Sequence, residues 1–201
     1  KYGNPNWGSA WNTTGPVSTA KARFLERVLA SYNISGKFLM NTESAVLCGG
    51  SGDPPGQPPC GSDPASEFER TKAYYVAQVY TAAIAEGLRA NVWFNLFGWR
   101  NSGLLNSDLS PRPAYTAYQF ARAEIGGARF VREISDYEGV KVYELSRGDR
   151  RIWVLWSLDD SPHSIILPGM PLAAYDALGT AVTVSNPLQV DLKPLYLEWS
   201  P

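Results

Sequence analysis

The clearest pattern in the chain is a short apolar run that ends at a carboxylate. Residues 37–44 read Lys-Phe-Leu-Met-Asn-Thr-Glu-Ser, so the apolar stretch leads directly to Glu43. A continuous run of this kind predicts a strand buried on both faces, as in a parallel sheet covered by helices. Such sheets place their chemistry just beyond the carboxyl ends of their strands. Glu43 is therefore either a catalytic carboxylate or an ordinary polar residue that ends a buried strand.

Segments with helical spacing alternate with apolar runs over residues 1–127. Helices are predicted at about 16–32, 63–86 and 112–125, where apolar side chains recur every three or four positions. A second apolar run, residues 91–96, predicts another buried strand. This alternation predicts a parallel sheet with helices outside it.

From Ala128 onward the period of the pattern changes to short alternating segments. Strands are predicted at residues 129–134, 140–146, 151–157, 164–167, 172–177, 188–192 and 195–199. Short strands separated by frequent turns predict an antiparallel β-sandwich. The sequence therefore predicts two domains, residues 1–127 and residues 128–201, with the boundary near Gly126-Gly127.

Composition narrows the possible partners. The 201 residues carry a net charge of −1 with no block of basic residues, which argues against nucleic acid or an anionic membrane surface as a partner. No apolar run approaches the roughly 18 residues that a membrane span needs. The chain contains 7 Trp, 11 Tyr and 7 Phe, and this content suits either a sugar-binding protein or an ordinary packed core.

The two cysteines, Cys48 and Cys60, flank a spacer rich in Gly and Pro. Two cysteines that close a flexible loop favour a disulfide, and hence a secreted or otherwise extracytoplasmic protein. A metal site is not expected, because two thiols are too few and the only histidine, His163, is distant in sequence. The chain begins at Lys1 without a signal-peptide pattern, so we expect a mature or trimmed product.

Several tryptophans fall in predicted loops or at strand ends. Trp7 and Trp11 lie in the loop over residues 1–15, Trp99 follows the second predicted strand, and Trp93 lies within it. Each is a candidate stacking surface for a sugar ring, and each could instead pack into a core.

Taken in order, these segments resemble the C-terminal part of a retaining glycoside hydrolase, of the (β/α)8 clan that carries its nucleophile Glu on barrel strand seven. The matching segments are residues 37–43 for strand seven, 90–96 for strand eight, 103–115 for the last loop and helix, and 154–157, 175–179 and 194–197 in the sandwich. The resemblance implies an α/β part followed by an all-β part. The first would be the last two to three β/α units of a TIM barrel, and the second a C-terminal antiparallel β-sandwich.

The resemblance also implies roles for individual residues. Glu43 would be the nucleophile, Trp93 the floor on which the sugar stacks unless it fills the barrel core, and Asn41 a neighbour that orients Glu43 or contacts substrate. The substrate would be an oligosaccharide or polysaccharide, and no cofactor is implied.

One departure from the family is clear. Barrel strands one to six, and with them the strand that carries the acid/base Glu, have no counterpart in the sequence. We therefore expect a fragment or subunit that lacks the acid/base Glu and is inactive alone. Its barrel would be completed by a second polypeptide or a missing N-terminal segment. The alternatives are a non-catalytic carbohydrate-binding module and a structural accessory domain.

Overall fold

The computed structural model describes residues 17–49, 60, 63, 66–159 and 161–201. Trp7 and Trp11 lie outside the described residues. The first part of the described chain alternates helix and strand, in the order α1 (Val17–Ser31), β1 (Asn41–Ser44), α2 (Glu67–Ala85), β2 (Asn91–Trp93), the 3₁₀ turn η2 (Trp99–Asn101) and α3 (Pro113–Ile125). β1 and β2 pair in parallel, which confirms the predicted α/β alternation.

The start of α2 differs from the prediction, which begins this helix at about residue 63. The helix begins at Glu67, and the side chain of Ser66 accepts a hydrogen bond from the backbone N–H of Glu69 at 3.3 Å. A Ser at the N-cap position satisfies one of the first free N–H groups of a helix. In a full capping box the Glu side chain would also accept from the N–H of Ser66, which here donates to the carbonyl of Asp63. The Ser66-x-x-Glu69 spacing was present in the sequence as a signal for this helix start.

The second part of the chain is built from antiparallel strands. A five-stranded sheet has the order β3-β4-β5-β9-β7, and β6 and β8 form a separate two-stranded sheet. The strands are β3 (Arg129–Ile134), β4 (Val140–Arg147), β5 (Arg150–Ser157), β6 (His163–Ile165), β7 (Ala173–Asp176), β8 (Leu188–Val190) and β9 (Leu195–Trp199). Seven antiparallel strands therefore lie where the alternating pattern predicts them. One buried cluster contains residues of both sheets, among them Trp153, Leu155, Ile165 and Val190.

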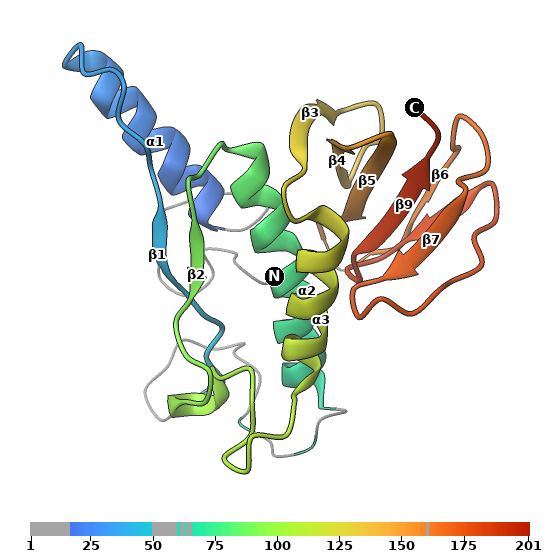
Figure 1. Cartoon of the computed structure of the whole chain (residues 1–201). Helices are drawn as coiled ribbons and strands as arrows, with labels where there is room; N and C mark the ends of the chain where they lie inside the picture. The colour runs from blue at the N-terminus through green and yellow to red at the C-terminus, as the bar shows by residue number, and fades with distance from the viewer. Residues whose placement is uncertain (1–16, 50–59, 61–62, 64–65, 160) are drawn as a thin grey trace.

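The helices α2 and α3 lie between the parallel strands and the five-stranded sheet (Figure 1). On one side their apolar residues join Trp93 and Val46 in a single cluster. On the other side Ala121 and Ile125 pack with Tyr143 and other residues of the sheet. The two helices therefore contribute buried residues to two separate clusters, one against each part of the chain.

The apolar runs predict strands that are buried on both faces of a complete sheet, and in this chain the two parallel strands are buried on one face. Five apolar residues in or beside β1 and β2 are exposed by 44–68%, and we call them the open strand surface: Phe38, Met40, Val92, Phe94 and Leu96. The regular strands are also shorter than the apolar runs, with four residues in β1 and three in β2. α2 and α3 pack against one face of the two strands, where Trp93 is buried, while these five side chains remain exposed.

Apolar side chains of the helix α1 are exposed as well. Phe24 and Leu25 of this helix are 42% and 47% exposed, and Tyr32, just beyond its end, is 73% exposed. In Figure 1 this helix extends away from the rest of the molecule, with β1 beside it. Ala22 of the same helix is 5% exposed, and Arg23 donates to Glu86, the C-cap residue of α2, at 2.9 Å.

Candidate active site

Glu43 lies near the carboxyl end of β1, where the parallel-sheet rule expects chemistry. It is exposed, and so is Thr42 before it, whereas Ser44 after it is buried. The preceding Asn41 pairs with Asn91 of β2, and Ser44 pairs with Trp93. Glu43 therefore projects a carboxylate from the rim of a two-stranded parallel sheet.

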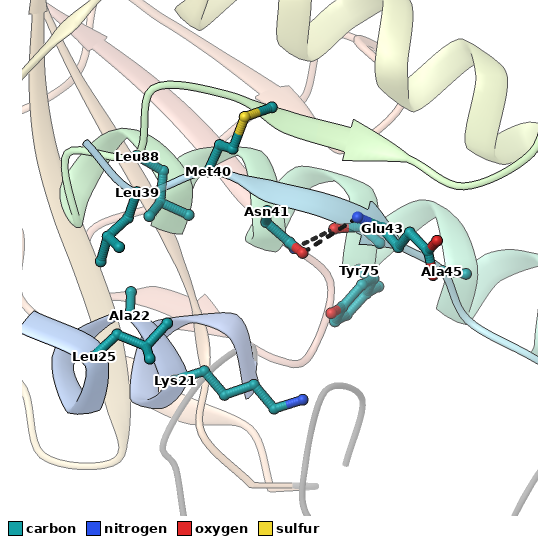
Figure 2. Close-up of a pocket in the computed structure, with 11 residues that line it drawn as sticks. Lys21, Ala22, Leu25, Leu39, Met40, Asn41, Glu43, Ala45, Tyr75 and Leu88 are labelled. Carbon is teal, nitrogen blue, oxygen red and sulfur yellow. Dashed lines mark hydrogen bonds between the residues drawn. The ribbon is translucent and has the colours of Figure 1, made fainter. Parts of the chain in front are cut away.

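A pocket of about 240 Å³ lies between α1, β1 and α2 (Figure 2). Lys21 and Leu25 reach it from α1, Asn41 and Glu43 from β1, and Tyr75 from α2. Among the described residues that line this pocket, Glu43 is the one carboxylate. The pocket thus combines apolar walls with one acidic and one basic side chain.

The side chain of Asn41 is engaged by its neighbours. Its Nδ2 donates to Ser44 Oγ at 2.7 Å and to Asn91 Oδ1 at 2.8 Å, and its Oδ1 accepts from the backbone N–H of Glu43 at 3.4 Å. Both amide hydrogens of Asn41 are therefore used within the protein. This arrangement suits an orienting role better than a direct hydrogen bond to substrate.

Trp93 is buried, at 9% exposure, on the side of the sheet that faces the helices. Its ring meets Tyr75 of α2 edge-on at a centroid distance of 6.3 Å, and its Nε1 donates to the carbonyl of Ser102 at 2.9 Å. Trp93 therefore lies against α2 in a buried cluster, the position that the core-filling alternative describes.

Trp99 has the opposite environment. It begins the turn η2 after β2 and is 67% exposed. The guanidinium carbon of Arg100 lies 5.1 Å from the Trp99 ring centroid, within the range of a cation–π contact. Arg100 and Asn101 both have left-handed φ angles, 54° and 53°, which non-glycine residues adopt at a cost. Surrounding contacts must therefore hold this turn.

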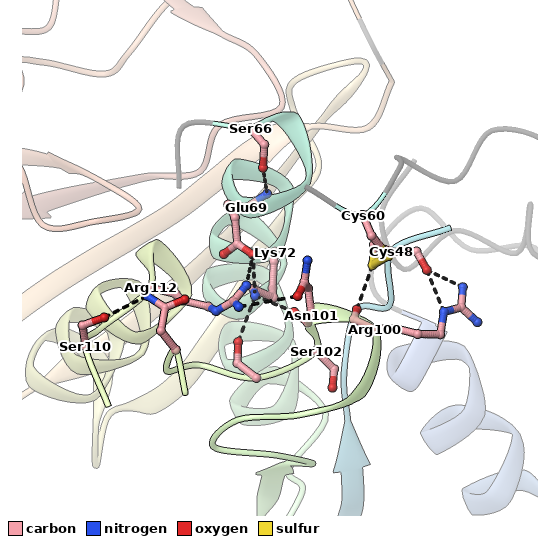
Figure 3. Close-up of polar contacts among 12 residues, drawn as sticks. Cys48, Cys60, Ser66, Glu69, Lys72, Arg100, Asn101, Ser102, Ser110 and Arg112 are labelled. Atoms are coloured by element: carbon pink, nitrogen blue, oxygen red, sulfur yellow. Dashed lines mark hydrogen bonds and ion pairs between the residues drawn. A yellow bond between two sulfur atoms is a disulfide. The ribbon is translucent and has the colours of Figure 1, made fainter. Parts of the chain in front are cut away.

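One set of contacts joins this turn to the disulfide. Cys48 and Cys60 are bonded, with their Cα atoms 4.9 Å apart, which confirms the predicted pair. The Nε of Arg100 donates to the carbonyl of Cys48 at 2.8 Å, and the N–H of Cys48 donates to the carbonyl of Arg100 at 3.2 Å (Figure 3). The loops that follow β1 and β2 are thus linked directly.

A second set of contacts to the turn comes from a buried charge cluster, which the sequence analysis missed. Lys72 Nζ donates to Glu69 Oε1 at 3.0 Å, to the carbonyl of Asn101 at 2.7 Å and to that of Gly103 at 2.8 Å (Figure 3). Arg112 Nη1 also donates to Glu69 Oε1, at 2.7 Å. Burial lowers the pKa of Lys72 to about 8, while Glu69 opposes the shift. The Glu69-x-x-Lys72 spacing inside an apolar helix face was the available signal.

No group of three or more His, Cys, Asp and Glu side chains in the described part of the chain is arranged to hold a metal ion. Within the same residues, no helix is both long enough and apolar enough to cross a membrane.

Comparison with known proteins gives a likeness of fold. No protein-family model and no curated protein sequence matches the chain. A family 39 glycoside hydrolase from Bacteroides cellulosilyticus WH2 is similar in structure, with a TM-score of 0.63, 18% identity, and coverage of 90% of this chain and 38% of that one. A family 30 endoxylanase from Clostridium papyrosolvens C71 has a TM-score of 0.55, 15% identity, and coverage of 94% and 47%.

A conserved exported protein from Bacteroides fragilis is also similar, with a TM-score of 0.61, 11% identity, and coverage of 90% of this chain and 43% of that one. The chain thus spans less than half the length of these three proteins. At such identities the likeness concerns the fold alone, and that fold is one found among glycoside hydrolases of families 39 and 30.

Proposed function

We propose that the chain is the C-terminal part of a retaining glycoside hydrolase, with Glu43 as its nucleophile. The observation that carries the proposal is the exposed carboxylate at the carboxyl end of a parallel strand, in a fold shared with glycoside hydrolases. In this proposal residues 1–127 contribute the last strands and helices of the catalytic barrel. Residues 128–201 form the accessory β-sandwich.

The reaction would cleave an O-glycosidic bond in an oligosaccharide or polysaccharide. The Glu43 carboxylate attacks the anomeric carbon, the bond to the leaving oxygen breaks, and a second carboxyl group protonates that oxygen. Water then cleaves the glycosyl ester and restores Glu43. Retaining enzymes hold the two carboxyl groups about 5–5.5 Å apart.

The buried carboxylate of Glu69 binds Lys72 and Arg112, so it is not available as the second group. The barrel strand that carries the acid/base Glu in this clan has no counterpart in the sequence. We therefore place the acid/base Glu in sequence that this chain lacks, and we expect the chain alone to be inactive.

The open strand surface supports this view of an incomplete barrel. A parallel barrel needs eight strands, and strands left at an edge expose unpaired backbone groups and apolar faces. Phe38, Phe94 and Leu96 are 47–68% exposed. We propose that further strands cover them, supplied by a longer form of the same chain or by a second polypeptide.

Of the candidate tryptophans that the structure describes, Trp99 is the one better placed to stack on a sugar. Its ring is exposed, and its turn is fixed by Arg100 and Lys72. Replacing Trp99 by Ala should weaken carbohydrate binding by about 1–3 kcal/mol, if sugar stacking resembles other aromatic stacking. The global stability should change little, because the ring buries little surface.

The nucleophile is tested with the complete enzyme, in which the remaining barrel strands are present. Glu43→Gln keeps the size and hydrogen-bonding capacity of the side chain and removes the nucleophile, so turnover should be abolished while the fold persists. Exposure of the unsubstituted enzyme to a fluorinated mechanism-based sugar should leave a covalent label on the peptide that contains Glu43. A label found elsewhere would end the assignment.

The alternative function is a non-catalytic carbohydrate-binding or structural accessory module, and the exposed ring of Trp99 is the observation that favours it. The two functions are separated by one pair of variants. If Trp99→Ala weakens binding while Glu43→Gln changes no activity in the complete protein, the binding module is the better description.

The disulfide is typical of proteins outside the reducing cytosol, and one protein of similar fold is described as exported. We propose an extracytoplasmic location on these grounds.

A further inference from the structure

The strand that carries Glu43 is irregular at the point where Glu43 projects. Asn41 pairs with Asn91 and Ser44 with Trp93, so three steps along β1 match two steps along β2. One extra residue in a strand is a β-bulge, which re-aims side chains and is frequent beside active sites. The bulge lies within the four residues Asn41–Ser44.

Side-chain contacts confirm that the alternation is broken here. In a regular strand, residues three positions apart face opposite sides of the sheet. Yet Asn41 Nδ2 and Ser44 Oγ are 2.7 Å apart, so both side chains point to the same side. Thr42 and Glu43 between them are both exposed. Regular alternation from Asn41 would have placed Glu43 on the side of Asn41 and exposed Ser44 instead.

Three polar side chains fasten the bulge to the neighbouring strand. Asn91 Oδ1 accepts from Asn41 Nδ2 at 2.8 Å and from Ser44 Oγ at 2.8 Å. The two ends of the bulge therefore converge on one acceptor of β2. Ser44 is only 3% exposed, so water competes little for its hydrogen bond. The Oδ1 of Asn41 adds a contact to the backbone N–H of Glu43 itself.

We propose that Asn41, Ser44 and Asn91 are positioning residues, which hold the bulge that turns Glu43 to the exposed side of the sheet. The proposal rests on the proposed function of Glu43 and assigns no contact with substrate to the three residues. Catalysis depends on geometry at this level, since a misplacement of about 1 Å can cost about a hundredfold in rate.

The test compares two variants of Ser44 in the complete enzyme. Ser44→Thr and Ser44→Val add nearly the same volume, but only Thr keeps the hydroxyl that donates to Asn91. The readouts are kcat and KM, the rate of labelling by a fluorinated mechanism-based sugar, and hydrogen exchange at the Glu43 amide. Asn91→Leu removes the shared acceptor and provides a second, independent variant. Val142→Ala, in the sheet core, controls for a general loss of stability.

We expect Ser44→Val and Asn91→Leu to lower kcat and the labelling rate by about tenfold or more relative to Ser44→Thr, with a smaller change in KM and faster exchange at Glu43. Val142→Ala should leave these quantities near those of the unsubstituted enzyme at temperatures where it is folded. Equal labelling of the Thr and Val variants, with Glu43→Gln inactive, would overturn the positioning role alone. A fully active Glu43→Gln enzyme would overturn the proposed function and, with it, this inference.

Discussion

Replacing Lys72 by Met should destabilise the protein far more than the loss of a surface charge would. Lys72 is completely buried, and its three ammonium hydrogens have three acceptors: the carboxylate of Glu69 and the carbonyls of Asn101 and Gly103. Met has nearly the same length and fills the same space without donating any hydrogen bond. The substitution therefore removes the polar contacts and leaves the packing largely intact.

The size of the expected loss in stability follows from the groups that remain buried when Lys72 is replaced. Among the described residues, Arg112 is the charged partner that Glu69 keeps. The Glu69 side chain is 2% exposed, so water cannot take the place of Lys72. The carbonyls of Asn101 and Gly103 lose their donor at the same time. Removing one partner of a buried ion pair costs about 3–5 kcal/mol, and we expect a loss of this size in the free energy of unfolding.

The assay is equilibrium unfolding in guanidinium chloride, with Lys193→Met as the matched control. Lys193 pairs with Asp176 at 3.1 Å, but its side chain is 38% exposed. The same substitution there should cost less than about 1 kcal/mol, because an exposed ion pair is solvated and screened. If Lys72→Met and Lys193→Met lose similar free energy, the buried cluster does not stabilise the turn that carries Trp99 and the reasoning is refuted.

Three further predictions concern the disulfide, the pH dependence and the assembly state. Thiol titration of the unfolded, unreduced protein should find no free thiol, and two reactive thiols per chain would contradict the Cys48–Cys60 bond. Burial, and then the charge of Glu198, raises the pKa of Glu124 from 4.5 to about 7, so the folded protein binds this proton more tightly than the unfolded chain. Its contribution to stability should therefore decline as the pH rises from about 4.5 to about 7. Glu124→Gln should flatten this dependence and stabilise the protein at pH 8 by on the order of 1–2 kcal/mol, as measured by denaturant unfolding at each pH. Light scattering should show self-association or a bound second polypeptide, because the open strand surface is apolar, and a monodisperse folded 22.1 kDa monomer would count against the incomplete barrel.

The elements of the fold could be predicted from periodicity because they depend on local pattern. The segments 129–134 and 195–199 are strands with the predicted bounds. The third helix, predicted from about Arg112, begins at Pro113, with Arg112 as its N-cap residue. Each of these is fixed by the alternation of side chains along a few consecutive residues, together with a proline or a turn at the end.

The burial of β1 and β2 could not be predicted in the same way. An apolar run indicates a strand that is buried in the finished fold, but it does not say which polypeptide covers it. Phe38 and Phe94 belong to such runs and are 68% and 47% exposed. The pattern therefore predicts the burial of these strands in a completed fold, whereas the structure gives their exposure in this chain.

The positions of Trp93 and Trp99 show a second limit of prediction from the sequence. Both Trp93 and Trp99 were sequence candidates for stacking, and only Trp99 is exposed. Trp93 turns inward because its Nε1 meets the carbonyl of Ser102, nine residues away, and its ring meets Tyr75 on α2. Such contacts depend on the packing of a loop, and no spacing rule anticipates them.

The contrast between the two regions around Glu43 bears on the proposed function. At the carboxyl ends of β1 and β2, several polar groups hold the turn: Lys72 uses all its donors, Arg100 binds the carbonyl of Cys48, and a left-handed turn is maintained at a cost. A few residues away, the open strand surface leaves large apolar side chains uncovered. An ordered turn of this kind costs free energy to maintain, and ligand binding at the turn would account for that cost. A ligand there has a closed site only if further strands complete the sheet. We therefore expect that covering the open strand surface and forming the carbohydrate site are one event, so that sugar binding at Trp99 should be much tighter in the completed assembly than in the isolated chain.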